Sequence, residues 1–334
     1  MSSITAGGGK ATGGRRRLLW LMAILVSPLA LFFAARGVLA VANVLLERRY
    51  PPPGQMISVG GHRLHLFCQG KGSPTIVIEP GLGVDWVAWA PVVEDLVTSV
   101  EVCVYDRAGY GWSEAGPMPR TAGQSAEELH QLLSSRPGPI VLVGHSFGGY
   151  ISRVYAARFA GAVQGVVLVD PSERDPAEVP TPASATEPRP RPWSVGRVID
   201  LLPPLGWERV KRLYHGESAL SERRRKLPPG FRHRIVVASS LDQLAAEQSE
   251  RDSSLPSQEQ VRAEPFPRHV PLVVITPLST SETHRELHRK IAEASDQGSQ
   301  VLADNSGHMV HIDRPDLIVS AVRGVISRSD RSLR

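Results

Sequence analysis

Between residues 55 and 330, short apolar runs of the strand type alternate with segments of helical periodicity. This alternation constrains the fold more than any other feature of the chain. The predicted strands are Met56–Val59, Arg63–Cys68, Thr75–Glu79, Val100–Tyr105, Ile140–Val143, Val166–Val169, Leu272–Thr276 and Gln300–Ala303. The predicted helices are Trp89–Thr98, Ala122–Leu133, Phe147–Phe159, Glu282–Ala294 and Pro315–Ile326. Two adjacent strands followed by strand–helix alternation predict an α/β fold, with a mostly parallel eight-stranded sheet and helices on both faces.

The alternation is interrupted once, by about 100 residues rich in Pro, Arg, Glu and Ser. A structureless loop of that length is uncommon inside a compact domain, so a mainly helical insertion is the better interpretation. We therefore expect a core made of residues 55–170 and 271–330, with residues 171–270 inserted between the two parts. A chain that is 42% hydrophobic and 21% charged has the composition of an ordinary globular protein.

The N-terminus predicts a membrane segment. Residues 1–17 read as a disordered basic lead-in that ends in three arginines, and residues 18–35 carry no charge. With the apolar residues that follow Arg36, the run extends to residue 46, long enough to span a bilayer, and the arginines favour a cytoplasmic N-terminus. We expect residues 18–46 to be a single-pass anchor in the cell membrane. A cleaved signal peptide ending near Ala40-Val41-Ala42 is the alternative, and the protein would then be secreted. Either way the core would be extracytoplasmic.

The charge distribution bears on partners. The formal net charge is +5, but the arginines are scattered and form no basic stripe interleaved with aromatic residues. Nucleic acid is therefore not an expected partner, while a mild attraction to anionic lipid agrees with the predicted anchor.

The stretch "IVLVGHSFGGYI" places a serine between glycines where a buried strand ends and an amphipathic helix begins. In a sharp strand-to-helix turn the hydroxyl of Ser146 is lifted above the sheet edge, and Gly144 and Gly148 avoid collisions with neighbouring backbone. The simpler alternative is a serine that only caps the helix. Because strand, turn and helix occur in this order, we interpret Ser146 as a nucleophile.

A serine nucleophile needs a base, and the acyl-transfer intermediate needs two N–H donors. His308 lies in the loop after the last strand and is the expected base, with His311 as its nearest rival. Phe147 N–H, at the start of a helix, is one expected oxyanion donor. The loop "EPGLG" after the third strand should supply the other, and we nominate Leu82.

Residues 55–330 resemble the α/β-hydrolase superfamily, on the basis of the serine turn, the Gly-His loop around His308 and the stretch "YDRAGYGWS". The resemblance implies an α/β-hydrolase fold in which residues 171–270 form a helical cap. It also implies structural rather than catalytic roles for Asp106, Arg107, Gly109 and Gly111. Neither a cofactor nor a metal is implied.

The third member of a catalytic triad departs from the usual family pattern. Family members commonly place the acid after the seventh strand, but here that turn reads "ITPLSTSE" and has no aspartate. Other members, such as pancreatic-type lipases, place it after the sixth strand, where this chain has Asp170 followed by proline. The resemblance therefore implies Asp170 as the acid that orients the imidazole, with Asp175 and Glu282 as alternatives.

The resemblance also bears on the two cysteines. In this superfamily the second strand lies beside the fourth, so Cys68 and Cys103 could form a disulfide, although two buried thiols remain an alternative. His284 and His288 have the i,i+4 spacing of zinc ligands on a helix, but no third ligand is evident. We interpret these histidines as part of a solvated helix face.

Together these features predict a serine hydrolase that cleaves a carboxylic ester of an apolar acyl group through an acyl-enzyme. Serine at position 146 argues against haloalkane dehalogenases and epoxide hydrolases, which the resemblance would require to carry aspartate there. Other acyl chemistry on the same triad is an alternative: amide, thioester or carbon–carbon bond hydrolysis, or acyl transfer. A low-turnover binding or sensor protein on a hydrolase scaffold is an alternative of another class.

Overall fold

The computed structural model describes residues 48–84, 86–136, 138–173 and 241–332, together with residues 30, 33, 34, 37, 38, 41, 44, 45, 214, 215 and 231. Most of the predicted membrane anchor and most of the predicted cap lie outside these residues. In the part of the chain that is described, no helix is both long enough and apolar enough to span a bilayer.

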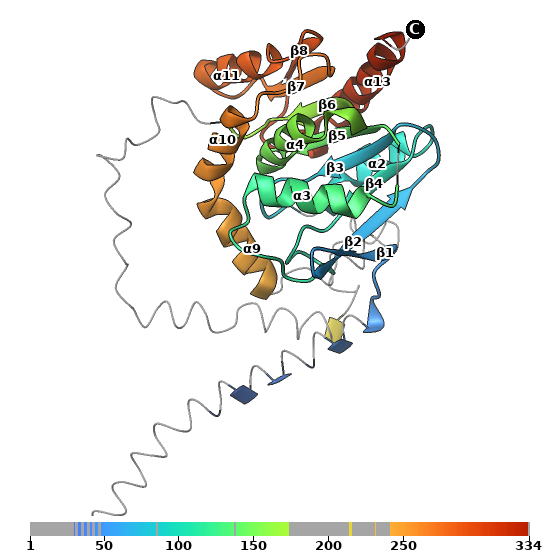
Figure 1. Ribbon diagram of the computed structural model, residues 1–334, viewed down its shortest axis with the longest axis vertical. Helices are drawn as coiled ribbons and strands as arrows, with labels where there is room; N and C mark the ends of the chain where they lie inside the picture. The colour runs from blue at the N-terminus through green and yellow to red at the C-terminus, as the bar shows by residue number, and fades with distance from the viewer. Residues whose placement is uncertain are drawn as a thin grey trace, which may run out of the picture.

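Eight strands form one sheet (Figure 1), as the sequence predicts, with the spatial order β1-β2-β4-β3-β5-β6-β7-β8. β2 is antiparallel to both β1 and β4, and all other neighbouring strands are parallel. The strands are β1 Gln55–Val59, β2 His62–Gln69, β3 Thr75–Glu79, β4 Val102–Tyr105, β5 Ile140–His145, β6 Val163–Val169, β7 Leu272–Pro277 and β8 Gly298–Ala303. Every residue of β4, β5 and β7 is buried, as expected for strands covered on both faces.

Helices cover both faces of the sheet and divide the core into two apolar layers. One layer packs against α2 (Ala90–Leu96) and α13 (Pro315–Ser332). The other packs against α3 (Ala122–Leu133), α4 (Phe147–Arg158), α10 (Ser254–Ala263) and α11 (Glu282–Ala292). Other described elements are the helix α9 (Leu241–Asp252), the short helix α12 (Val310–Asp313) and the 3₁₀ helices η1 (Trp86–Trp89) and η2 (Ala160–Ala162).

The described C-terminal part of the predicted insertion is helical, and α10 is docked on the core beside α4 and α3 (Figure 1). Polar side chains make the junction. Ser257 Oγ accepts the N–H of Ala122 at 2.9 Å, and the Tyr150 hydroxyl donates to Gln258 Oε1 at 3.1 Å. Residues 241–263 are therefore continuous with the core packing.

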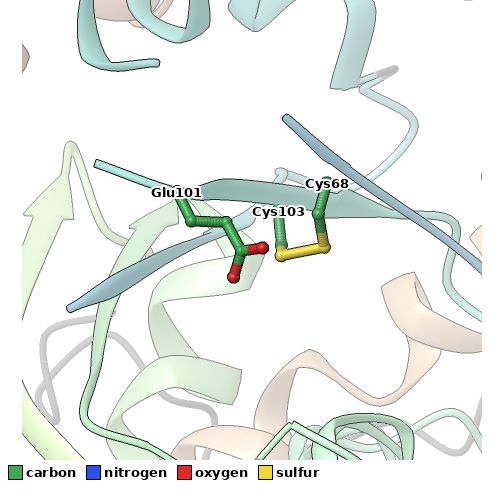
Figure 2. A group of neighbouring side chains, drawn as sticks. All are labelled: Cys68, Glu101 and Cys103. Carbon is green, nitrogen blue, oxygen red and sulfur yellow. A yellow bond between two sulfur atoms is a disulfide. The ribbon is translucent and has the colours of Figure 1, made fainter. Parts of the chain in front are cut away.

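A disulfide joins the two cysteines, which are direct partners across the antiparallel β2–β4 pair (Figure 2). Its Cα–Cα distance is 4.0 Å and it links residues 35 apart in sequence. Of the two alternatives for the cysteines, the structure has the disulfide. The bond links the N-terminal hairpin β1–β2 to β4 in the central sheet.

Candidate active site

The turn after β5 is a strained strand-to-helix elbow. Ser146 has φ 52° and ψ −120°, a backbone conformation that costs energy for any residue with a side chain. A Cβ on Gly148 would lie 2.3 Å from the Glu79 carbonyl oxygen, and one on Gly144 would lie 2.4 Å from Ser152 Oγ. Both positions therefore require glycine. The elbow presents Ser146 at the carboxyl edge of the sheet.

The Ser146 hydroxyl lies 3.4 Å from Ser172 Oγ, within hydrogen-bond range. Ser172 is held next to the elbow because its N–H donates to the Ser146 carbonyl oxygen at 3.0 Å. No hydrogen bond joins Ser146 to His308 in the described residues.

Asp170 and His308 form a close pair at the same edge of the sheet. Asp170 directly follows β6 in a left-handed conformation with φ 40°, and its N–H donates to the Ile275 carbonyl at 2.8 Å. His308 Nδ1 is 2.6 Å from Asp170 Oδ2. Burial opposes ionisation of the Asp170 carboxyl, but contacts with His284 and His308 hold its pKa well below the usual value. The ionised carboxylate therefore accepts from Nδ1–H, which leaves Nε2 of His308 as the free acceptor.

The rival residues have other environments. His311 is fully buried and stacks on Trp89, with ring centroids 4.5 Å apart. Burial lowers the pKa of His311 to about 3. Glu282 is exposed and pairs with Arg285 on α11, and Asp175 lies outside the described residues. Neither His311 nor Glu282 takes part in the Asp170–His308 contact, so among the described candidates the geometry pairs Asp170 with His308.

His145, the residue before the serine, contacts the His308 loop, which the sequence reasoning missed. Its ring is fully buried, and Nε2–H donates to the His308 carbonyl oxygen at 2.9 Å. Burial, reinforced by the nearby His308 ring, lowers the pKa of His145 to about 4, so the ring is neutral. It thereby ties the His308 loop to the elbow. The signal available in the sequence was its place directly before Ser146.

The loop after β3 approaches the elbow closely. A Cβ on Gly81 would lie 3.2 Å from Ser146 Cβ, so this loop runs directly beside the serine. The Leu82 N–H donates to no acceptor within the described parts of the chain. Phe147 begins α4, where helix N–H groups have no intrahelical partner. Both nominated oxyanion donors thus belong to segments that border Ser146.

The interpretation of His284 and His288 as a solvated face is wrong. His288 is fully buried, and the side chain of His284 is only 29% exposed, with Nε2 3.4 Å from Asp170 Oδ1. Asp170 thus supplies the carboxylate that a three-ligand cation site would need. The donor set does not fit a metal, however, because His288 Nε2–H donates to the Pro171 carbonyl and Nδ1 faces the Thr276 hydroxyl, each at 2.9 Å. The two histidines instead face the Asp170 carboxylate, and the sequence missed this because α11 reads as strongly polar.

A cavity of about 230 Å³ opens beside the Asp170–His308 pair. Its walls are formed by Tyr150, Asp170, Pro171, Ser172, Glu173, Ser254, His284 and His308. A larger cavity of about 400 Å³ lies near the amino ends of the strands, lined by residues such as Pro139 and Val163, and is remote from the elbow. Of these two cavities, the smaller one adjoins Asp170 and His308.

Comparison with known proteins agrees with this architecture. The chain is 25% identical to the uncharacterized protein YqjL of Bacillus subtilis (strain 168) over 260 residues, which are 77% of this chain and 85% of that protein. A thermophilic esterase from Thermogutta terrifontis matches with a TM-score of 0.56 and 21% identity, over 82% of this chain and 97% of that one. The enol-lactonase from Burkholderia xenovorans LB400 matches with a TM-score of 0.56 and 22% identity, over 82% of this chain and all of that one. At these identities the two structural likenesses establish the fold alone.

Residues 76–321 match the sequence pattern of the Alpha/beta hydrolase family, which covers more than half of the chain. Together with the sheet order and the strained serine elbow, this match establishes that the chain belongs to the alpha/beta hydrolase family.

Proposed function

We propose that the protein is a serine hydrolase that cleaves a carboxylic ester through an acyl-enzyme, with Ser146 as nucleophile, His308 as base and Asp170 as acid. The observation that carries the proposal is the 2.6 Å contact between His308 Nδ1 and Asp170 Oδ2 at the sheet edge where the elbow presents Ser146. That contact fixes the imidazole tautomer in which Nε2 can accept a proton.

The reaction follows from these roles. Nε2 of His308 takes the proton of the Ser146 hydroxyl as its oxygen attacks the ester carbonyl. The N–H groups of Leu82 and Phe147 bind the oxyanion, while Asp170 stabilises the imidazolium. The imidazolium then protonates the leaving alcohol. Water, deprotonated by His308, then attacks the acyl-enzyme. The carboxylic acid product leaves as His308 returns the proton to the Ser146 oxygen.

An ester with an apolar acyl group is the proposed substrate class. The esterase and the enol-lactonase among the structural matches have names that refer to ester or lactone hydrolysis, which supports an ester substrate but says nothing of the acyl group. Serine at the elbow supplies the nucleophile that such a reaction needs.

One observation favours a second candidate, a ligand-binding protein with little turnover. The Ser146 hydroxyl lies next to Ser172 Oγ and is not hydrogen-bonded to His308. Catalytic hydrogen bonds are often long before substrate binds and tighten in the complex, so this geometry is compatible with a hydrolase, which stays the first candidate.

A fluorophosphonate probe separates the two candidates. We expect stoichiometric modification of the wild-type protein, loss of labelling in Ser146→Ala, and strong loss in His308→Ala because the hydroxyl then lacks its base. Hydrolysis of p-nitrophenyl esters of graded chain length should follow the same order. His269→Ala, at an exposed histidine, is the matched control and should label like wild type. An unlabelled wild-type serine would leave the binding protein as the better account.

Residues 18–46 are proposed to anchor the chain in the cell membrane with the hydrolase core outside the cytoplasm. Their apolar composition and the preceding arginines support the anchor, and the Cys68–Cys103 disulfide suits an oxidising compartment. Membranes washed with alkaline carbonate should retain the full chain and release a variant that lacks residues 18–46. In the retained protein, both cysteines should resist alkylation until a reductant is added. Release of the full chain into the wash would count against the anchor, and release at a shorter mass would indicate cleavage.

A further inference from the structure

The buried side chain of Arg107 connects three parts of the molecule. Its guanidinium has five N–H donors, and each has an acceptor. Nη1 donates to Glu79 Oε1 at the end of β3 and to the Pro80 carbonyl, each at 2.7 Å. Nη2 donates to the Gly81 carbonyl at 3.1 Å. Nε and Nη2 grip Glu250 of α9 at 2.7 and 2.9 Å. The orientation of Arg107 is therefore fully determined by its partners.

These contacts control the peptide that carries the expected oxyanion donor. In a trans peptide the carbonyl and the following N–H point in opposite directions. Because Arg107 and the Val84 N–H both hold the Gly81 carbonyl oxygen, the Leu82 N–H is directed to the side away from Arg107. Rotation of this peptide would turn a carbonyl oxygen toward the oxyanion and remove a donor.

Gly83, on the other side of Leu82, is connected to the Glu250 carboxylate as well. The Gly83 N–H donates to the Tyr110 hydroxyl at 3.3 Å, and that hydroxyl donates to Glu250 Oε2 at 2.7 Å. Gly81 and Gly83 are thus linked to Glu250 by two separate routes, through Arg107 and through Tyr110. Leu82 lies between the two tethered residues.

Burial makes Glu250 hard to replace in this network. The side chain of Glu250 is 0% exposed and that of Arg107 is 3% exposed. Glu79, the second carboxylate on Arg107, also accepts from the Tyr105 hydroxyl, and burial raises its pKa to about 7. Without the Glu250 carboxylate, two buried guanidinium donors would lose their acceptors, a loss that costs more than the net value of the hydrogen bonds themselves. Arg107 would then have to move, and its hydrogen bond to the Gly81 carbonyl would be displaced or lost.

We propose that Glu250 is a positioning residue for the oxyanion hole, acting through Arg107 and Tyr110 to fix the direction of the Leu82 N–H. This inference rests on the proposed function and extends it to α9. Because α9 lies in the C-terminal part of residues 171–270, the segment that the sequence predicts as the cap, the seating of α9 couples that end of the insertion to the loop at Leu82.

The test compares two buried ion pairs. Glu250→Gln keeps the size of the side chain but loses its charge and presents an amide to Arg107. Glu128→Gln makes the same change in the buried Arg120–Glu128 pair (2.5 Å, side chains 0% and 5% exposed), which touches neither Arg107 nor the loop at Leu82. Both variants should lose thermal stability. Loss of an oxyanion donor costs about 100- to 1,000-fold in kcat, so Glu250→Gln should lose at least about tenfold in kcat with little change in KM. Glu128→Gln should retain the wild-type kcat.

A trifluoromethyl ketone, which forms a tetrahedral adduct with the serine, provides an independent readout. In Glu250→Gln its inhibition constant should rise by the same factor by which kcat/KM falls, since both depend on the oxyanion hole. If Glu250→Gln does not fold, Tyr110→Phe removes only one hydroxyl from the network and should show a smaller loss of the same kind. Wild-type kcat in a folded Glu250→Gln or, failing that, in Tyr110→Phe would overturn the inference while the proposed function stands. A wild-type protein without Ser146-dependent turnover would overturn both.

Discussion

At the scale of single residues, the two oxygens of the Asp170 carboxylate have different surroundings. One oxygen accepts from His308, and the other lies 3.4 Å from His284 Nε2 and 3.9 Å from His288 Nδ1. His288 is fixed in turn by the Thr276 hydroxyl and the Pro171 carbonyl. The Asp170 carboxylate therefore faces α11 on one side and pairs with His308 on the other.

Asp170→Asn tests the assignment of the acid. An amide can accept a hydrogen bond from Nδ1–H only if its oxygen faces His308, and it cannot stabilise the imidazolium by charge. We expect kcat to fall by about 10⁴-fold, the scale known for loss of the acid in serine triads. The measurement is steady-state ester hydrolysis alongside circular dichroism to verify folding.

Glu282→Gln is the matched control because this rival acid is exposed and pairs only with Arg285 among the described residues. It should retain the wild-type rate. A large loss in Glu282→Gln with an active Asp170→Asn would reassign the acid.

Residue-level prediction from sequence was strongest where a motif fixes the backbone. The elbow sequence predicts Ser146 because only glycine tolerates the close approaches at positions 144 and 148. The roles of His145 and Glu250 could not be predicted, since each contacts residues far away in the chain: His308 for the first, Arg107 for the second. The structural role expected for Arg107 agrees with its buried contacts, but the expectation gave no partners.

At the scale of elements, hydrophobic periodicity predicted the eight strands and the five listed helices to within three residues, except that α13 extends six residues beyond its predicted end. The region before α2 differs, because a 3₁₀ turn at Trp86–Trp89 precedes the helix and Pro91 sits in the first turn, where its missing N–H costs nothing. The docking of α10 on α3 and α4 could not be predicted. Its buried Ser257 and Gln258 are polar, and they are stabilised by hydrogen bonds that a hydrophobic pattern does not reveal.

At the scale of the whole molecule, buried titratable groups make stability depend on pH. Burial is the main cause that lowers the pKa of His145 and His288 to about 4 and of His311 to about 3. Between about pH 5 and 6 these rings are neutral in the folded state but protonated in the unfolded chain. Glu79 acts in the opposite sense, because burial raises its pKa to about 7 and the folded state holds the extra proton. The unfolded chain thus binds a net excess of about two protons from these groups, so their contribution to stability falls as the pH drops through this window.

His311→Phe should weaken this dependence. The ring stacks on Trp89, and neither of its nitrogens has a hydrogen-bond partner in the described residues, so phenylalanine keeps the stacking and loses no bond. The slope of unfolding free energy against pH should decrease by about 1.4 kcal/mol per pH unit between pH 5 and 6. Urea denaturation at several pH values measures the slope.

His269→Ala, at an exposed histidine, again serves as the control and should leave the slope unchanged. A slope in His311→Phe equal to that of the wild type would show that His311 takes up its proton without unfolding.

The pairing of Cys68 with Cys103 has a mechanical consequence. Among the described strands, β1 lies at the edge of the sheet and pairs with β2 alone. Tension applied upstream of β1 could peel β1 from β2, and then β2 from β4, one backbone contact after another. The sulfur bridge stops this unzipping within β2, because a covalent link there passes the load into β4 and the middle of the sheet. A force on the N-terminal end would therefore detach β1 from the sheet before it disturbed the elbow at Ser146.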